Sequence, residues 1–342
     1  MRQWICCLLL ALIASPLLAA PPATLRMLAW PGYADADLVA AFEQRYQVKV
    51  EVTLVSSDEV LWHKLSTNQG ADYDLFAANT AELQRYIAAG LVAPLDLANI
   101  PNRSKQLARF REPDLAGVSS AGVVYAVPYT YSEMGLIYDR RHFAQPPRSW
   151  QVLWQPQYQG KVLMYDGGYH AFSLAALTAG QDPFAIATDQ FNPLARQLVA
   201  LRRNLLTLYT TPEQATALFR DRGALLLFGN FGTQQLKALR DAGVDAGYVI
   251  PQEGALAWLD CWAVSIGRRD QALAEAWINY SLEPEVSAAL SERQGLANTI
   301  SANPNARDRD RIIWLRQVED PDRRSALWQR VVAGDRPERF GP

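Results

Sequence analysis

Aromatic and polar side chains recur where short apolar segments of this sequence give way to turn residues. In chain order they are Trp30, Tyr33, Asn79, Tyr131, Glu133, Asp166, Asn230, Phe231, Trp258 and Asp260. Ligand sites in open α/β sheets lie where strands end and loops begin. An aromatic face attracts an organic ammonium group by about 0.5 to 2 kcal/mol, and a nearby carboxylate accepts its N–H bonds. The set therefore suits an organic amine, although the same grouping can hold a sugar or a small molecule with both an acid and an amine.

A single tryptophan, such as Trp30 or Trp258, more often fills a hydrophobic core than lines a ligand site. The position that these residues share, at the ends of expected strands, is what favours a site over core packing. The interpretation therefore depends on the set and not on any one ring.

The sequence lacks the local motifs of common enzymes. It has no GxSxG, HExxH, GxxxxGK, GxGxxG or CxxC pattern. The histidines His63, His142 and His170 are far apart and form no metal-ligand spacing. A lone histidine is more often a surface or packing residue than a ligand. The sequence therefore predicts no enzyme, no catalytic residue, no metal site and no cofactor.

Composition and charge are typical of a globular protein. Of the 342 residues, 49% are hydrophobic and 20% are charged, with 33 Lys and Arg against 35 Asp and Glu. This length allows two compact lobes or one large domain, each able to bury a core. Because no long block of one charge sign occurs, there is no electrostatic reason to expect a nucleic acid or an acidic membrane as the main partner.

Residues 1–20 have the layout of a cleaved secretory signal peptide. They contain an early arginine, an apolar run over residues 4–13, a break at residues 15–16 and small residues before Pro21. An uncleaved membrane anchor is the alternative, but the apolar run is short for a span. Cleavage removes Cys6 and Cys7 and leaves Cys261, so the mature protein can form no internal disulfide. The predicted location is the periplasm.

Apolar patterns alternate between strand and helix along the chain. Residues 25–28 and 48–55 are expected to be parallel strands on either side of a helix, and residues 58–67 form the next helix. Residues 73–78 read as a buried strand, after which Thr80 is expected to cap a helix that Gly90 ends. A second α/β set is expected from residue 161 to 228, and one amphipathic helix from 312 to 333. The pattern predicts α/β sheets covered on both faces, in two lobes.

Pro128 interrupts an extended segment in the middle of the chain. Residues 123–129 and 134–138 read as strands, and Tyr131 and Glu133 lie between them. A crossover between two lobes and a kink in an edge strand explain the proline equally well. The sequence leaves both readings open.

Six segments match one known family in the same order. They are LAWPGYADADLVAAFEQRYQVKV, YDLFAAN, YAVPYTY, QGKVLMYD, PQEGALAWLDCWAV and ALWQRVVAGD. Over essentially its whole mature length the chain resembles the periplasmic solute-binding proteins of the spermidine/putrescine type, which serve ABC transporters. The resemblance implies a two-lobe periplasmic-binding-protein fold of type II, with a ligand cleft between lobes joined by hinge strands. The expected boundaries are 21–132 and 252–298 for one lobe, and 133–251 and 299–342 for the other.

The resemblance also implies roles for individual residues. Trp30 and Tyr33 would line an amine channel, and Asn79 would occupy a polar pocket position. Trp258 would form an aromatic wall, and Asp260 would be the carboxylate that holds an ammonium group. Beyond these residues, Asn298 lies next to a further pocket position of the family.

The second acidic cluster of the family is largely missing from this sequence. After the strand that ends at residue 165 only Asp166 remains, and His170 falls near a usual glutamate. A pocket tryptophan of the family is replaced by Asn230, with Phe231 adjacent. A linear polyamine needs an acceptor at each end, because a desolvated unpaired ammonium group is costly.

Asp260 supplies one of the two acceptors, and Asp166 or Glu133 is a candidate for the other. Because the second acceptor is not fixed by the family pattern, the ligand could be a shorter amine or one with a single cation.

Two functions are therefore expected for this chain. The first is capture of a small organic amine, a polyamine such as putrescine or spermidine, for uptake through an inner-membrane ABC permease. The alternative is a periplasmic sensor that presents amine occupancy to a membrane-bound signalling partner. The resemblance further implies a monomer in which an open, empty form closes when both lobes contact the ligand.

Overall fold

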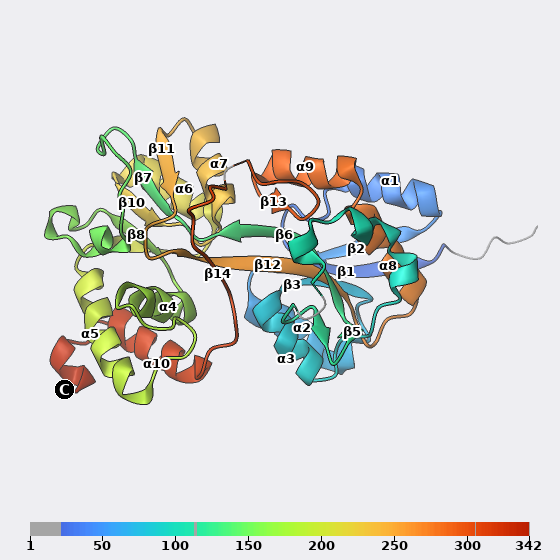
Figure 1. Cartoon of the computed structure of the whole chain (residues 1–342), viewed down its shortest axis with the longest axis horizontal. Helices are drawn as coiled ribbons and strands as arrows, with labels where there is room; N and C mark the ends of the chain where they lie inside the picture. The colour runs from blue at the N-terminus through green and yellow to red at the C-terminus, as the bar shows by residue number, and fades with distance from the viewer. Residues whose placement is uncertain (1–21, 113–114, 305, 342) are drawn as a thin grey trace, which may run out of the picture.

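The computed structural model describes residues 22–112, 115–304 and 306–341. The predicted signal peptide, residues 1–20, lies outside the described residues. Two β-sheets, each with helices on both faces, form two lobes side by side (Figure 1). This arrangement confirms the predicted two-lobe α/β fold. Among the described residues, no helix is long and apolar enough to cross a membrane.

The sheet of the first lobe, called lobe 1 below, has the strand order β13-β6-β12-β3-β1-β2, and β14 also pairs with β12. Its strands are β1 (Thr24–Ala29), β2 (Lys49–Leu54), β3 (Leu75–Asn79), β6 (Ala126–Glu133), β12 (Ala255–Val264), β13 (Ala297–Asn298) and β14 (Ile312–Trp314). β1 is parallel to β2, as predicted, and also to β3, whereas β12 is antiparallel to β3 and β6. A short hairpin, β4 (Ser119–Ser120) and β5 (Val123–Val124), lies outside this sheet.

The helices of lobe 1 bury one apolar side each against the sheet. They are α1 (Ala36–Tyr46), α2 (Asp58–Ser66), α3 (Thr80–Ala88), α8 (Gln271–Ser281) and α9 (Pro284–Gln294). Phe42 of α1 and Trp277 of α8 belong to the cluster on one face. Leu61 of α2 and Leu83 of α3 belong to the cluster on the other face. The sheet is therefore covered on both sides, and the N-terminal ends of α2 and α3 come to the edge that faces the other lobe.

The second lobe, called lobe 2 below, has the strand order β11-β7-β10-β8-β9. Its strands are β7 (Leu136–Asp139), β8 (Val162–Tyr165), β9 (Leu205–Tyr209), β10 (Leu226–Phe228) and β11 (Ala246–Val249). Its helices are α4 (Gly168–Thr178), α5 (Phe191–Arg202), α6 (Pro212–Arg222), α7 (Thr233–Asp241) and α10 (Pro321–Val332). α4, α5 and α10 pack on one face, and α6 and α7 on the other.

Short 3₁₀ segments complete the described secondary structure. They are Thr67–Gly70, Leu97–Asn99, Pro101–Lys105, Ala108–Phe110, Trp150–Trp154, Pro156–Tyr158, Thr188–Gln190 and Pro337–Phe340.

The chain passes between the lobes at β6 to β7, at β11 to β12 and at β14 to α10 (Figure 1). The crossover reading of the middle segment is therefore right, but the crossing follows Glu133 and not Pro128. Pro128 lies inside β6, where its pairing with β12 shifts register between Asp260 and Cys261. The lobe boundaries given above in residue numbers stay a prediction.

The expectation of one helix over residues 312–333 is wrong at its start. Residues Ile312–Trp314 form β14, which pairs in parallel with the first residues of β12, and the helix begins at Pro321. A three-residue strand has little pattern of its own and is defined by the strand beside it. Its pairing ties the C-terminal segment to a strand that runs between the lobes.

Candidate functional site

The carboxylate of Asp260, in β12, is buried at the junction of the lobes, with 7% of the residue surface exposed. The hydroxyl of Tyr33 donates a hydrogen bond to its Oδ2 at 2.5 Å. Burial raises the pKa of Asp260 to about 7, although the bond from Tyr33 lowers it. Near neutral pH this carboxyl is therefore only partly ionised, and a cation placed beside it would favour the charged form.

The turn after β1 positions Tyr33 for this bond. The backbone N–H of Tyr33 donates to the carbonyl of Trp30 at 3.1 Å. Between them, Gly32 has a φ of +86°, and a Cβ there would lie 2.3 Å from Cδ of Gln294. The end of the Gln294 side chain can move, so the positive φ, which only glycine adopts readily, is what requires glycine here. The indole of Trp30 donates to the carbonyl of Ala77 at 3.1 Å, which holds the ring at the end of the strand.

Three of the predicted site residues lie in one row across the sheet of lobe 1. Asp260 is opposite Asn79 of β3 and Thr130 of β6, and Thr130 is opposite Asn298 of β13. Residues directly opposite on antiparallel strands share a face and are close neighbours. Asn79 is therefore next to Asp260, whereas Asn298 is two strands away. The side chain of Asn298 caps the following turn, where its Oδ1 accepts two backbone N–H bonds.

Asn79, and not Thr80 as predicted, caps α3. Its Oδ1 accepts from the backbone N–H groups of Ala81 at 3.1 Å and Glu82 at 3.0 Å. Its amide nitrogen donates to Oδ1 of Asp58 at 3.2 Å. Asn79 precedes the first helical residue and has an extended backbone, which is the geometry that a capping side chain needs.

Asp58 is a site residue that the sequence prediction missed. It is partly exposed at the first turn of α2, and enough protein surrounds it that burial is the main cause of its strongly raised pKa. The negative charges of Glu82, Asp260 and Glu59 raise this pKa further, in that order. Asp58 and Asp260 are therefore close enough to interact. We call Asp58, Glu82 and Asp260 the acidic group.

Four rings of lobe 2 lie next to one another and are called the ring group: Tyr165, Tyr169, His170 and Phe231. The ring centroids of Tyr165 and His170 are 5.7 Å apart, those of Tyr169 and His170 5.0 Å, and those of Tyr165 and Phe231 5.8 Å. Burial raises the pKa of Tyr165 to about 12, and the negative charge of Asp58 is the next cause. The ring group and the acidic group therefore face each other across the junction of the lobes.

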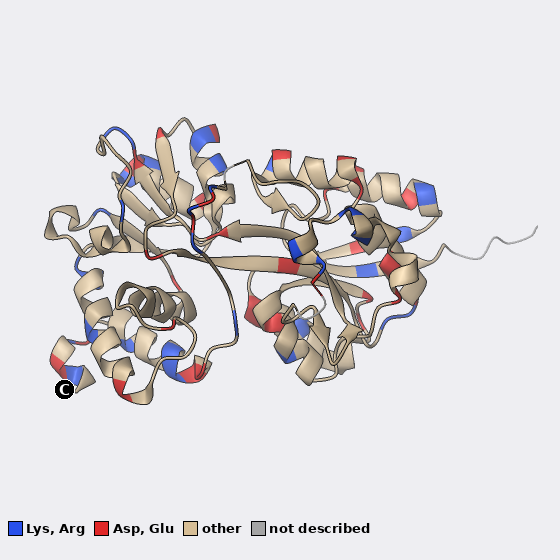
Figure 2. Cartoon of the chain, in the orientation of Figure 1, with Lys and Arg blue, Asp and Glu red and all other residues tan. Residues whose placement is uncertain are grey.

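The charge of lobe 2 at this junction differs from that of lobe 1. Acidic segments mark the N-terminal ends of α2 and α3 and the middle of β12, whereas the facing helix α4 contains no Lys, Arg, Asp or Glu (Figure 2). Burial lowers the pKa of His170 to about 4, so this ring is uncharged at neutral pH. Its Nδ1 has no hydrogen-bond partner among the described residues. His170 therefore cannot supply the anion that the family has nearby.

Asp166 is the predicted acid of lobe 2, and another residue already bonds to it. Its Oδ1 accepts from the indole N–H of Trp328, in α10, at 2.8 Å, and the residue is exposed. The negative charge of Asp166 raises the pKa of Tyr165, so Asp166 lies beside the ring group.

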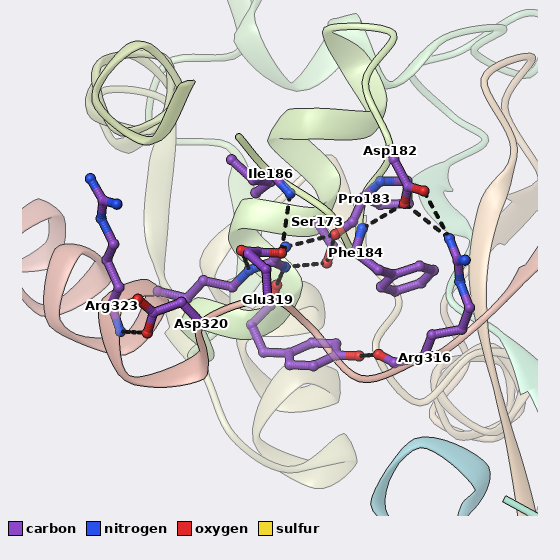
Figure 3. Close-up of polar contacts among 11 residues, drawn as sticks. Ser173, Asp182, Pro183, Phe184, Ile186, Arg316, Glu319, Asp320 and Arg323 are labelled. Atoms are coloured by element: carbon purple, nitrogen blue, oxygen red, sulfur yellow. Dashed lines mark hydrogen bonds and ion pairs between the residues drawn. The ribbon is translucent and has the colours of Figure 1, made fainter. Parts of the chain in front are cut away.

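A buried arginine of α10 anchors the start of α4, which contains Tyr169 and His170 of the ring group. All five N–H donors of Arg324 are used: two go to Glu319 at 2.8 Å each, and the others to Ser173, Pro183 and the carbonyl of Tyr169. Figure 3 shows Ser173, Pro183 and Glu319 converging on this point. At Gly168 a Cβ would lie 2.8 Å from the carbonyl oxygen of Arg324, so only glycine allows α10 this close to α4.

Trp258 and Asn230 join the two lobes. Trp258, in β12, packs against the apolar clusters of both lobes, and its indole donates to the carbonyl of Asn230 at 3.2 Å. Asn230 in turn donates its backbone N–H to the hydroxyl of Tyr209 at 3.1 Å. Trp258, Asn230 and Phe231 therefore come together at the junction.

Tyr131 and Glu133 lie in a different place. Tyr131 accepts from Arg109 at 2.6 Å and packs in the cluster on the face of the sheet opposite to Tyr33. Burial raises the pKa of Glu133, whose neighbours are Asp310 and Arg109. The carboxylate of Asp260 bonds to Tyr33, on the other face of the sheet. Tyr131 and Glu133 therefore belong to a second polar cluster, near the hinge.

The described residues contain no group of three or more His, Cys, Asp or Glu side chains that could hold a metal ion.

Comparison with known proteins places this arrangement in a family. Residues 37–316 match the family described as bacterial extracellular solute-binding protein. The chain belongs to this family. Its curated relatives include the putrescine-binding periplasmic protein PotF of Escherichia coli, which is 26% identical over 355 residues and is matched over 93% of each chain. The norspermidine sensor of Vibrio cholerae is 23% identical over 211 residues, covering 58% of this chain and 53% of the sensor.

Solved structures show the same fold. The Tp0655 (TpPotD) lipoprotein of Treponema pallidum has a TM-score of 0.78 at 20% identity, over 90% of this chain and 99% of that one. The solute-binding family and this likeness confirm the predicted two-lobe binding-protein fold. The family and its putrescine-binding relative are binding proteins.

Proposed function

We propose that this protein binds a small organic amine of the polyamine class, such as putrescine or spermidine, between its two lobes in the periplasm. In this proposal it delivers the amine to an inner-membrane ABC permease. It acts as a monomer and catalyses no reaction. The relatives named for putrescine or spermidine support the ligand class.

The observation that carries the proposal is the environment of Asp260. This carboxylate is 7% exposed, is bonded to Tyr33, and lies two residues along β12 from the large ring of Trp258. A buried carboxylate beside aromatic faces provides the two interactions that an alkylammonium ion needs. Its raised pKa shows that burial disfavours its negative charge, and a cation bound beside it would offset that cost.

Closure of the lobes fits the same site. Ala81, in the first turn of α3 in lobe 1, packs with the apolar cluster of lobe 2. The acidic and ring groups therefore belong to a closed arrangement, and a ligand between them would contact both lobes. Contacts made only in this form would shift the population toward it.

The test is a thermal unfolding assay of the purified mature protein with putrescine, cadaverine, spermidine, spermine, agmatine and γ-aminobutyrate. A ligand that binds only the folded form raises the melting temperature by mass action, by about 2.7 kcal/mol of stability at 100 times its dissociation constant. We expect a rise with at least one di- or polyamine and none with sodium chloride at equal ionic strength. If no amine raises the melting temperature, the proposal fails.

A sensor role is the second candidate function, supported by the match to the norspermidine sensor. That match covers 58% of this chain, against 93% for the putrescine-binding relative. Co-purification of the tagged protein from its own membranes separates the two roles. A permease and its ATPase support transport, and a membrane sensor kinase or cyclase supports signalling.

A further inference from the structure

The acidic group contains more carboxyl groups than a single ammonium ion requires. Asp58 and Asp260 interact with each other, and Glu82 adds a third negative charge. Arg85 is the base beside them, but it pairs with Glu82 at 3.7 Å, and its guanidinium carbon is 3.5 Å from the ring centroid of Trp62. Among the described residues, neither Asp58 nor Asp260 forms an ion pair. The two carboxylates therefore lack a cation.

The position of Asp58 is fixed by the strand ends around it. Because Oδ1 of Asn79 is occupied by two backbone N–H groups, its amide nitrogen must point the other way, and it donates to Asp58. Asn79 also lies directly opposite Asp260 in the sheet. Asp58 and Asp260 are thus two acids beside one residue, Asn79: the first is bonded to its side chain and the second lies opposite it in the sheet.

A second and independent observation comes from Tyr86. This residue is 0% exposed, and its hydroxyl has no hydrogen-bond partner among the described residues. Burial raises its pKa, and the charges of Glu82 and Asp58 raise it further, so the hydroxyl lies close to both carboxylates. A fully buried hydroxyl without a partner is costly. The hydroxyl could accept an N–H bond from a cation held by Asp58.

Lobe 2 offers no comparable acid. His170 is uncharged at neutral pH, and Asp166 accepts the indole N–H of Trp328. The surface that lobe 2 presents to the acidic group consists of the rings of Tyr165 and Tyr169, whose pKa values respond to the charge of Asp58. A second ammonium group would therefore find its anion in lobe 1.

We propose that Asp58 is the second ammonium-binding carboxylate of the site, so that Asp58 and Asp260 of lobe 1 hold both ends of a short diamine while the ring group of lobe 2 covers it. This inference rests on the amine-binding function proposed above and specifies the ligand. Because one acid bonds to Asn79 and the other lies opposite it in the sheet, we expect the ligand to be a short diamine. A ligand with a carboxylate at its second end would meet Asp58 and Glu82 and be repelled.

The experiment is isothermal titration of the full mature chain at pH 7.5. The ligands are 1,3-diaminopropane, putrescine, cadaverine, spermidine, n-butylamine and γ-aminobutyrate. Putrescine and n-butylamine have the same carbon chain and differ by one ammonium group. We expect a short diamine to bind at least about tenfold more tightly than n-butylamine, because the second charge-assisted bond is made only by the diamine. γ-Aminobutyrate should bind most weakly.

The key variant is Asp58→Asn, and the matched control is Asp322→Asn, an exposed aspartate in the first turn of α10. Asp58→Asn should weaken diamine binding by about tenfold or more and change n-butylamine binding by less than about twofold, which removes the preference between them. Asp322→Asn should leave both affinities unchanged. Because Asp58→Asn removes a like-charge repulsion, the empty variant should melt no lower than the parent, which shows that it is folded.

The possible failures can be told apart. If no amine binds the parent protein, the proposed function fails, and this inference fails with it. If diamines bind the parent and Asp58→Asn equally well, amine binding stands and the role of Asp58 is wrong. That role is also wrong if Asp166→Asn, and not Asp58→Asn, removes the preference for putrescine over n-butylamine.

Discussion

The two lobes present different chemistry to the space between them. Lobe 1 brings carboxylates from the middle of β12 and from the first turns of α2 and α3. Lobe 2 brings uncharged rings from the end of β8, the first turn of α4 and the loop after β10. For the function proposed above, this comparison predicts a division of roles, in which lobe 1 determines the charge of the ligand and lobe 2 covers it and excludes water.

The anchoring of the two surfaces differs as well. Two of the acids of lobe 1, Asp58 and Glu82, are near helix N-termini, where the partial positive charge of the helix favours an anion. The rings of lobe 2 depend instead on one buried cation, Arg324, which bonds to the carbonyl of Tyr169 and to Glu319. Damage to the lobes should therefore have different consequences: loss of ligand charge recognition in lobe 1, and loss of structure in lobe 2.

The largest expected effect is that of Arg324→Met. The change leaves Glu319 without its partner and breaks the link to Tyr169, and breaking a buried ion pair in this way costs about 3 to 5 kcal/mol. Thermal unfolding should show a fall in melting temperature well beyond that of Arg330→Met, an exposed arginine of the same helix. Equal melting temperatures for the two variants would show that Arg324 does not anchor the ring group.

The next effect is that of Asp260→Asn on ligand binding. Asparagine keeps the shape but not the charge, and removal of one partner of a buried charge pair costs about 2 to 5 kcal/mol. Titration with the best amine should show a loss of about 100-fold in affinity. The melting temperature of the empty protein should not fall, because the substitution removes an acid that burial disfavours. Unchanged affinity would place the ammonium group elsewhere.

Acidification should weaken binding and strengthen the empty protein. The pKa of Asp260 is about 7 in the empty protein, and an alkylammonium ion remains charged far above that pH. Amine affinity should fall by about tenfold per pH unit below 7, because the carboxyl must lose its proton to bind.

The stability of the empty protein should change in the opposite direction. A folded state with a raised carboxyl pKa binds more protons than the unfolded chain, so the free energy of unfolding rises as the pH falls toward 5. Titrations and melts at pH 5.5, 6.5 and 7.5 check both trends as the difference between the parent and Asp260→Asn, because Asp58 and His170 have shifted pKa values in both proteins. A pH-independent affinity would contradict the assignment of Asp260.

The smallest effect is expected for Tyr33→Phe. The Tyr33 hydroxyl bonds to Asp260 and lowers its pKa, so its loss should raise that pKa and reduce amine affinity by about tenfold at pH 7. Tyr129→Phe is the control, because that ring packs against Tyr33 at 5.7 Å without bonding to Asp260. If both variants bind as the parent does, the hydroxyl has no part in preparing the carboxylate.

Much of the fold follows from local sequence patterns. The unit from β1 through α1 to β2 is predicted because a short apolar run, a helical apolar spacing and an alternating β-branched run follow one another in a short stretch. β14 and the cap at Asn79 are not predicted, because each depends on a neighbour: β12 for the strand, and the competing Thr80 for the cap.

The candidate site is predicted in part for the same reason. Tyr33, Trp258 and Asp260 come together as expected. Tyr131 and Glu133 lie in another cluster, because the register shift between β6 and β12 places Tyr131 on the opposite face of the sheet. The sequence does not single out Asp58, because an acidic residue after two serines is typical of the start of a helix and needs no ligand to explain it. The rule that points to Trp30 and Asn79, that sites lie where strands end, also applies to the loop after β2 and would have found Asp58.

The most direct test of the division between the lobes is a crystal structure of the mature protein with putrescine bound. The account predicts one nitrogen of the diamine within hydrogen-bond distance of Asp260 and the other within that distance of Asp58, with the carbon chain between Trp258 and the ring group. A nitrogen bonded to Asp166 or Glu133, with Asp58 facing water, would contradict it.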